Sequence, residues 1–102
     1  MKYVIGIIRG GTLEKLSREL GRGGIYRLTI SEVEILDTAA ASSPGEEERR
    51  LRVEIAVNDD FLAPALQAFE AVRDADETAP VSVLPLEEVV RIRTGETGRE
   101  AI

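Results

Sequence analysis

Hydrophobic residues recur with two different periods along the chain, and the change between these periods separates the predicted strands from the predicted helices. Residues 2–9, KYVIGIIR, form a β-branched run that predicts a strand with both faces buried. After Gly10 and Gly11, Thr12 is expected to cap a helix that ends near Leu20. The apolar positions of this helix share one face: Leu13, Leu16 and Leu20.

A second strand is predicted over residues 25–36, where apolar and polar residues alternate. One face of this strand carries the apolar residues Tyr26, Leu28 and Ile30. Beyond Glu32 the apolar phase shifts by one residue, which predicts a bulge or bend at Ser31–Glu32. Residues 37–49, DTAAASSPGEEER, lack such a period and are rich in turn-forming residues, so we expect an exposed, mobile loop.

The third strand has the clearest alternation in the chain and is predicted over residues 50–57. A second helix follows it, for which Asn58, Asp59 and Asp60 are candidate N-caps. Pro64 is tolerated in this helix only near the first turn, because proline lacks the backbone N–H that later turns need. The helix carries one apolar stripe: Phe61, Ala65, Leu66, Phe69 and Val72.

A short strand at residues 81–84 and a last strand at residues 89–93, VVRIR, complete the predicted elements. With right-handed crossovers, the order strand, helix, strand, strand, helix, strand predicts an α+β, ferredoxin-like βαββαβ sandwich. We expect a single domain over residues 1–102. The helices would cover one face of a four-stranded sheet. We expect other copies of the chain to cover the opposite face, through the double-sided first strand and the Tyr26, Leu28 and Ile30 face.

Composition then narrows the classes of function. The chain has 102 residues, and its 19 acidic against 13 basic residues give a net charge of -6, which argues against a nucleic-acid binder. It contains neither Cys nor His, which removes thiol chemistry, imidazole bases and the usual zinc sites, so we expect no enzyme and no metal site. No apolar run approaches the roughly 20 residues of a membrane span, and the chain is expected to be soluble and cytoplasmic.

Arg91 and Arg93 carry the most promising chemistry. They lie two residues apart on a predicted strand, so both guanidinium groups are expected to project to the same side. Two such groups can bind successive phosphates of a nucleotide bidentately. Thr94 and Gly95 would add a hydroxyl group and an unhindered backbone. The spacing alone leaves it equally open that these arginines form the solvated face of an edge strand.

The stretch RIRTGETG at residues 91–98, with Ala101 and Ile102 after it, resembles the C-terminal signature of the PII signal-transduction family. IIR at residues 7–9, LTISEV at 28–33 and RVEIAVNDD at 52–60 are similar to other parts of that family. The resemblance implies a homotrimer of ferredoxin-like subunits with adenine-nucleotide sites in the clefts between subunits. It also implies that the loop at residues 37–49 transmits the ligand state to a protein partner.

Site residues are also implied by this resemblance, position by position. Arg91 and Arg93 would bind the nucleotide phosphates, Thr29 and Ile7 would lie beside the adenine, and Glu54 would line the base pocket. Other roles stay open for the last three: Thr29 as a strand-forming β-branched residue, Ile7 as a core residue and Glu54 as an ordinary cross-strand charge.

Departures from the family pattern modify the expected ligands. Residues 75–80, ADETAP, contain no glycine, and Pro80 stands where the family has a phosphate-binding lysine. Because a glycine-rich nest of N–H groups suits phosphate oxygens, its loss favours ADP or AMP over ATP. The loop at 37–49 contains no tyrosine for uridylylation, and Ser42 and Ser43 are the remaining candidates for modification.

The same loop lacks the residues that the family uses for magnesium and 2-oxoglutarate, because Asp37 and Ala39 replace a glycine and a glutamine. Arg50 is the best match for the basic residue that pairs with the 2-oxoglutarate carboxylate, and it is a candidate site for a small anion. Carboxysome-associated PII-like proteins, which sense adenine nucleotide with bicarbonate, are family variants of this description. We therefore expect a non-catalytic trimeric regulator that binds ADP or AMP, with bicarbonate as a candidate second ligand. The alternatives are a nitrogen-regulatory PII-type sensor and a ligand-free adaptor trimer.

Overall fold

The computed structural model describes residues 1–36, 50–73 and 80–102. Two short 3₁₀ helices, η1 (Gly10–Thr12) and η3 (Asp59–Phe61), precede the two α-helices, and a third, η4 (Gly98–Ala101), lies near the C-terminus. The predicted loop at 37–49 and residues 75–79 of the ADETAP segment lie outside the described residues. The main elements, in chain order, are β1 (Lys2–Arg9), α1 (Leu13–Arg22), β2 (Thr29–Val33), β3 (Arg50–Val57), α2 (Leu62–Val72) and β4 (Val81–Pro85).

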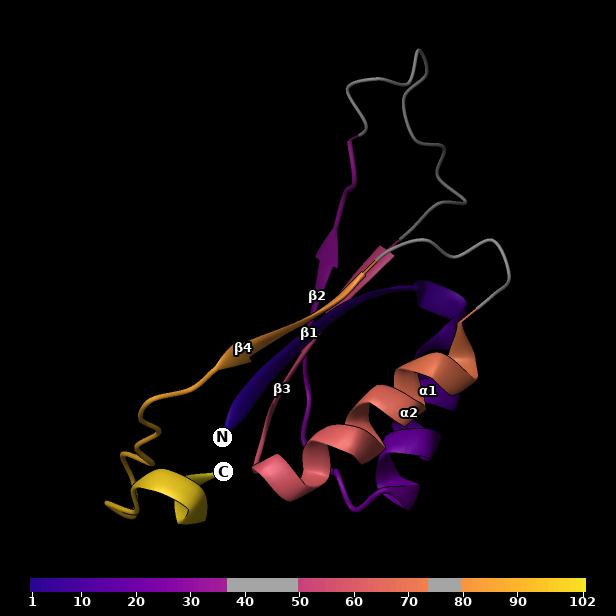
Figure 1. The fold of residues 1–102 in the computed structure, drawn as a ribbon. Coiled ribbons are helices and arrows are strands. Elements are labelled where there is room, and N and C mark those ends of the chain that lie inside the picture. The colour runs from indigo at the N-terminus through magenta and orange to yellow at the C-terminus, as the bar shows by residue number, and fades with distance from the viewer. Residues whose placement is uncertain (37–49, 74–79) are drawn as a thin grey trace.

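The four strands form one sheet in the order β2-β3-β1-β4 (Figure 1). β1 pairs antiparallel with β3 along its whole length and with β4 along its first half, and β2 pairs antiparallel with β3. β1 and β2 therefore run parallel with β3 between them, and β3 and β4 run parallel with β1 between them. Both helices lie on one face of the sheet (Figure 1). This arrangement is the predicted ferredoxin-like βαββαβ sandwich.

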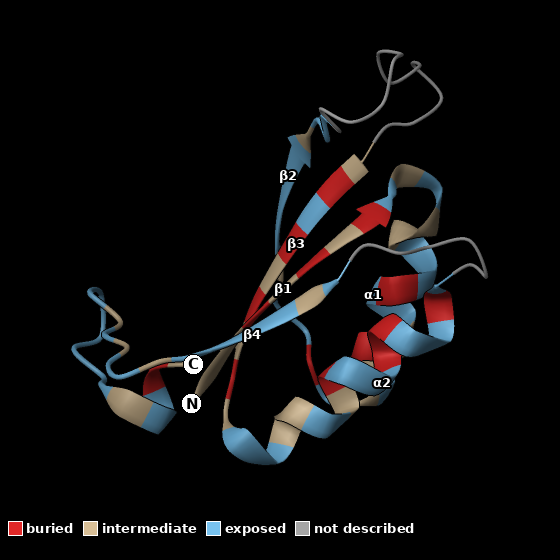
Figure 2. Cartoon of the chain, turned by 45° about the horizontal axis from the view of Figure 1, so that its top comes forward, coloured by how far each residue is buried: buried red, intermediate tan, exposed pale blue. Residues whose placement is uncertain are grey.

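The core lies between this sheet and the helices. On β1 and β3 every second residue is buried against α1 and α2, as Figure 2 shows by the alternation of red with tan or blue. The predicted apolar helix faces are confirmed, except that Leu66 is exposed. The largest fully buried side chains are Val4, Leu16, Leu20, Val53 and Ile55.

The opposite face of the sheet is only half covered within one chain. Tyr3, Ile5 and Ile7 on β1 alternate with the core residues and are partly exposed, so the prediction of a first strand buried on both faces is not met by the single chain. We call this surface the open face. An apolar strand face left half exposed is typical of a surface that another protein chain covers.

The second strand is shorter than predicted and contains no bulge. β2 pairs with β3 without interruption from Thr29 to Val33, so the predicted bend at Ser31–Glu32 is wrong. Ile30 lies opposite the core residue Val53 and therefore faces the helices. The expectation that Tyr26, Leu28 and Ile30 lie on the open face is also wrong, because Leu28 packs against the core and Tyr26 is 85% exposed outside the sheet.

The predicted N-caps do not form, because each α-helix is entered through a 3₁₀ helix. Thr12 already has helical backbone angles, and its hydroxyl group donates a hydrogen bond to the carbonyl of Arg9 at 2.7 Å. No side chain caps α2 either, whose preceding residue Phe61 is also helical. α1 continues past the predicted end at Leu20 and stops at Gly23.

The fourth strand is formed by residues 81–85 instead of the predicted VVRIR stretch at 89–93. β1 offers its free edge to β4 only as far as Lys2, which lies opposite Pro85. Leu86 makes one further backbone hydrogen bond, its N–H donating to the carbonyl of Met1 at 3.0 Å. Residues beyond Leu86 have passed the end of β1, so this stretch finds no strand to pair with in the described chain.

Gly6 provides a direct test of the packing between β1 and α2. A Cβ atom added at Gly6 would collide with the ring of Phe69, whose Cζ would lie 2.9 Å away. We expect Gly6→Ala to lower the free energy of unfolding by about 1–3 kcal/mol, measured by urea denaturation. The loss should shrink when the same change is made in a Phe69→Leu background.

The matched control for this change is Gly11→Ala, where the added Cβ would meet no atom within 4 Å. It should leave stability close to that of the wild type. Equal stability of Gly6→Ala and the wild type would contradict the described contact between β1 and α2.

Candidate functional site

Three of the predicted site residues share the open face. Thr29 on β2 lies directly opposite Glu54 on β3, and Glu54 lies directly opposite Ile5 on β1. Ile7 follows two residues after Ile5 and therefore lies on the same face. Partners in a β-ladder project to the same side of the sheet, so the structure brings the predicted base-binding residues together across three strands.

Glu54 is held in place from two sides. The hydroxyl group of Tyr3 donates a hydrogen bond to Oε2 of Glu54 at 2.5 Å, and Nε of Arg52 lies 2.7 Å from Oε1. Arg52 lies on the same strand as Glu54, so this ion pair runs along β3 and not across the sheet. Both carboxylate oxygens therefore have partners, which fixes the direction in which Glu54 can accept a further hydrogen bond.

Tyr3 is the residue of this cluster that the sequence analysis missed. Tyr3, Ile5 and Ile7 alternate along β1 and therefore share one face, so this spacing alone could have predicted that Tyr3 belongs to the cluster. The hydrogen bond to Glu54 raises the pKa of Tyr3 above its usual value, and partial burial and the negative charge of Glu54 act in the same direction, against a smaller opposing effect of Arg52. The phenol thus stays protonated and remains a donor to Glu54.

Arg50 lies at the end of the open face that is nearest residues 37–49 in the sequence. It is the first residue of β3, directly after the 37–49 segment, and it lies opposite Arg9 on β1 and opposite Val33 on β2. The sheet therefore presents two arginine side chains at its end nearest this segment. Such a position is compatible with the predicted binding of a small anion.

Arg91 and Arg93 are placed differently from the prediction. They belong to a turn, which is closed by hydrogen bonds from the N–H of Arg91 to the carbonyl of Glu96 and from the N–H of Gly95 to the carbonyl of Arg91, both at 2.8 Å. The prediction that a strand projects both side chains to the same side is therefore wrong. Arg91 is partly buried and its Nε donates to the carbonyl of Ala101 at 3.4 Å, whereas Arg93 is exposed.

One chain does not place this turn beside Thr29. β2 and β4 are the two edge strands, and the C-terminal segment leaves the sheet from the β4 edge (Figure 1). The predicted phosphate-binding arginines and the predicted base-binding residues thus lie in separate parts of a single chain.

The described residues contain neither a cluster of metal-binding side chains nor a membrane-spanning helix. Within residues 1–36, 50–73 and 80–102, no group of three or more acidic side chains could hold a metal ion. In the same part of the chain, no helix has the length and apolar character needed to cross a membrane.

Comparison with known proteins connects this chain to one family. A family model described as nitrogen regulatory protein P-II matches residues 1–96. The nitrogen regulatory protein GlnK1 of Methanosarcina mazei is 37% identical over 118 positions, which cover 100% of this chain and 97% of the relative. The P-II proteins of Nostoc punctiforme and Azospirillum brasilense are 31% and 30% identical, and each alignment covers 100% of both chains. Because 118 aligned positions exceed the 102 residues here, part of GlnK1 has no counterpart in this chain.

The Tyr3–Glu54 contact predicts a titration that can be followed directly. The chain has two tyrosines, so Tyr26→Phe leaves Tyr3 as the one observed phenol. In that background, Glu54→Gln should lower the pKa of Tyr3 toward its usual value, because it removes the negative charge and weakens the hydrogen bond that is the largest cause of the raised pKa. Tyrosinate absorbance during an alkaline titration measures this shift, and Glu14→Gln on α1 is a control that should not move it.

The hydrogen bond between Tyr3 and Glu54 also makes the stability of the folded protein depend on pH in the alkaline range. A folded-state pKa raised above the unfolded value of about 10 gives a contribution that is fully present below pH 10 and is lost as the pH rises through the folded pKa. Glu54→Gln should therefore reduce the difference in stability between neutral and strongly alkaline pH. An identical alkaline unfolding profile in the two proteins would contradict this role of Tyr3.

Proposed function

The chain belongs to the nitrogen regulatory protein P-II family, and we propose that it is a homotrimeric regulator that binds an adenine nucleotide between subunits and signals through residues 37–49. Proteins of this family are regulatory signal transducers that form homotrimers and bind nucleotides and partner proteins. The observation that carries the proposal is the open face, where Ile7, Thr29 and Glu54 converge. In this proposal they form the base side of the nucleotide site.

The surfaces that one chain leaves uncovered support association with other copies, as in the proposed trimer. Ile5 and Ile7 on the open face are partly exposed, Leu84 on the same face is 43% exposed, and Ile92 in the arginine turn is 89% exposed. Covering these apolar groups with other copies would remove them from water and stabilise the assembly. The same association would bring the arginine turn of one subunit to the open face of its neighbour, which a single chain does not do.

Within that site we assign the phosphates to Arg91 and Arg93. A guanidinium group can make two parallel hydrogen bonds to a phosphate and keeps its charge at all relevant pH values. Arg93 is exposed and therefore available to a ligand, while Arg91 is braced by its contact with the Ala101 carbonyl. The positive φ of Gly95, 75°, closes the turn that presents both side chains.

We further propose that ADP or AMP is bound more tightly than ATP. Pro80, directly before β4, provides neither a cationic side chain nor a backbone N–H for an outer phosphate. Asp76 and Glu77 in the adjoining sequence add negative charge, which opposes a third phosphate.

Among the effector pathways, we favour nitrogen regulation. The matched relatives carry nitrogen-regulatory names, including GlnK1 and P-II, which supports the nitrogen-sensor alternative over the carboxysome-associated one. Bicarbonate remains a secondary proposal, with Arg50 as its binding residue. The absence of a glutamine side chain at Ala39 argues that 2-oxoglutarate is not sensed in the usual way of the family.

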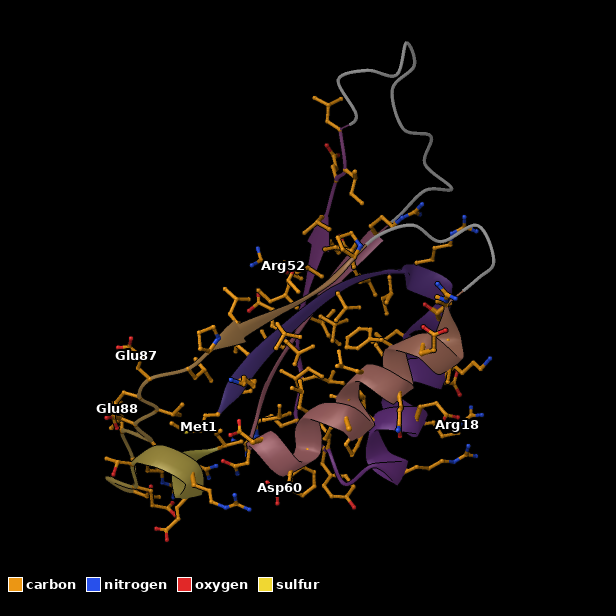
Figure 3. All side chains as sticks on the ribbon, viewed as in Figure 1. Met1, Arg18, Arg52, Asp60, Glu87 and Glu88 are labelled. Atoms are coloured by element: carbon orange, nitrogen blue, oxygen red, sulfur yellow. The ribbon has the colours of Figure 1, made fainter. Side chains whose placement is uncertain are left out.

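Substitution of the two arginines tests the phosphate assignment. Arg91→Ala and Arg93→Ala should each weaken ADP binding at least about tenfold, since a hydrogen bond to a charged group contributes about 1.5–3 kcal/mol. Isothermal titration calorimetry measures the effect, and Arg18→Ala on α1 is a control that removes an exposed arginine elsewhere (Figure 3). Unchanged dissociation constants in both variants would assign these arginines to the solvated surface.

Thermal melts with ADP, AMP, ATP and bicarbonate distinguish the sensor from the ligand-free adaptor. A ligand that binds only the folded trimer raises the melting midpoint. We expect the rise to be larger for ADP and AMP than for ATP at equal concentration. No rise in the midpoint with any nucleotide at millimolar concentration would support the adaptor alternative. A rise with bicarbonate and with no nucleotide would indicate that a small anion is the principal ligand.

A further inference from the structure

The C-terminal segment that carries the two arginines is held at both ends by contacts outside the sheet. At its start, the N–H of Leu86 donates to the carbonyl of Met1 at 3.0 Å. Its middle is a turn whose base is closed by a hydrogen bond from the N–H of Gly98 to the carbonyl of Val89 at 2.9 Å. An isolated bridge between Val90 and Thr97 adds to this closure. The turn is therefore a defined unit, but these internal contacts do not orient it relative to the sandwich.

Its far end is attached to the connection between β3 and α2. Nη2 of Arg99 lies 2.9 Å from Oδ2 of Asp60, and Nδ2 of Asn58 donates a hydrogen bond to the carbonyl of Arg99 at 3.2 Å. Figure 1 shows η4, in yellow, beside the start of α2, and Figure 3 labels Asp60 there. We call these two contacts of Arg99 the latch.

The latch is linked to the arginine turn by a short path. Arg99 belongs to η4 together with Ala101, which is buried, and the carbonyl of Ala101 accepts the hydrogen bond from Nε of Arg91. The 3₁₀ helix η4 thus connects Asp60 on one side to Arg91 on the other. If η4 moves away from Asn58 and Asp60, the Ala101 carbonyl that accepts the hydrogen bond from Arg91 moves with it.

We propose that the latch formed by Arg99 with Asp60 and Asn58 positions the arginine turn for binding the phosphates of an adenine nucleotide. This inference rests on the proposed function above, and it adds positioning residues that do not touch the ligand. Arg99 and Asp60 are exposed side chains, at 65% and 59%, so their effect is expected on the orientation of the turn and not on the stability of the core. A latched turn would raise the fraction of molecules that are competent to bind, and the apparent affinity scales with that fraction.

Both side chains of the Arg99–Asp60 ion pair are charged near neutral pH. The neighbouring guanidinium group of Arg99 lowers the pKa of Asp60, and the carboxylate raises the pKa of Arg99. Both directions keep the pair ionised. Screening by salt weakens an exposed pair, so the contribution of the latch should decrease at high ionic strength.

Disruption of the pair in the full chain tests the proposal. Arg99→Ala and Asp60→Asn should each increase amide hydrogen exchange within residues 86–102 and weaken ADP binding about two- to fivefold, the range of an exposed ion pair. The double variant should be no weaker than either single variant, because both remove the same interaction. Glu70→Gln, which breaks the exposed 3.1 Å pair with Arg73 near the end of α2, is the matched control and should change neither measurement.

A charge-swapped variant separates positioning from a purely local effect. Arg99→Asp combined with Asp60→Arg should restore both the exchange protection and the ADP affinity toward wild-type values, with the melting temperature nearly constant throughout. Unchanged hydrogen exchange in the single variants overturns the latch whether or not nucleotide binds. Increased exchange with unchanged ADP affinity overturns its positioning role, and failure of the wild type itself to bind any adenine nucleotide overturns the proposed function instead.

Discussion

The pairing of β1 with β3 along their full lengths is the interaction on which the rest of the molecule depends. It places the alternating apolar residues of two central strands on one side, where the helices cover them, and it assigns every intervening residue to the other side. The same register carries Glu54 to its neighbours on β1 and β2. A shift of one residue would exchange the core face with the face that carries the candidate site, so the fold and the candidate site depend on one set of backbone hydrogen bonds.

Much of this sandwich is predictable from local pattern, because its central elements are strongly periodic. The third strand was predicted with its observed bounds since its alternation is uninterrupted from Arg50 to Val57. The missed features depend on interactions that a pattern does not contain. The apolar character of residues 89–93 suits a strand, but β1 is too short to pair with it after β4. The predicted helix caps are wrong because the chain enters both helices through 3₁₀ turns, so the residue before each α-helix already has helical backbone angles.

The sequence predicts which residues belong to the candidate site better than it predicts how they are arranged. Family resemblance pointed to Ile7, Thr29 and Glu54, and the strand register places them on one face. The partners that hold Glu54 were not foreseen in full, since Tyr3 is remote in sequence and meets the carboxylate only through the pairing of β1 with β3. The two arginines sit in a turn followed by η4, where Arg99 contacts Asn58 and Asp60 in the connection between β3 and α2, and spacing alone carries no information on such contacts.

The close approach of Gly6 to Phe69 has a consequence for how this sequence can diverge. The two positions lie far apart along the chain, yet the space of one is filled by the ring of the other. A larger residue at Gly6 is therefore better tolerated when the aromatic ring at position 69 has been replaced by a smaller side chain. Substitutions at these two positions are therefore expected to be coupled, although they lie 63 positions apart in the sequence.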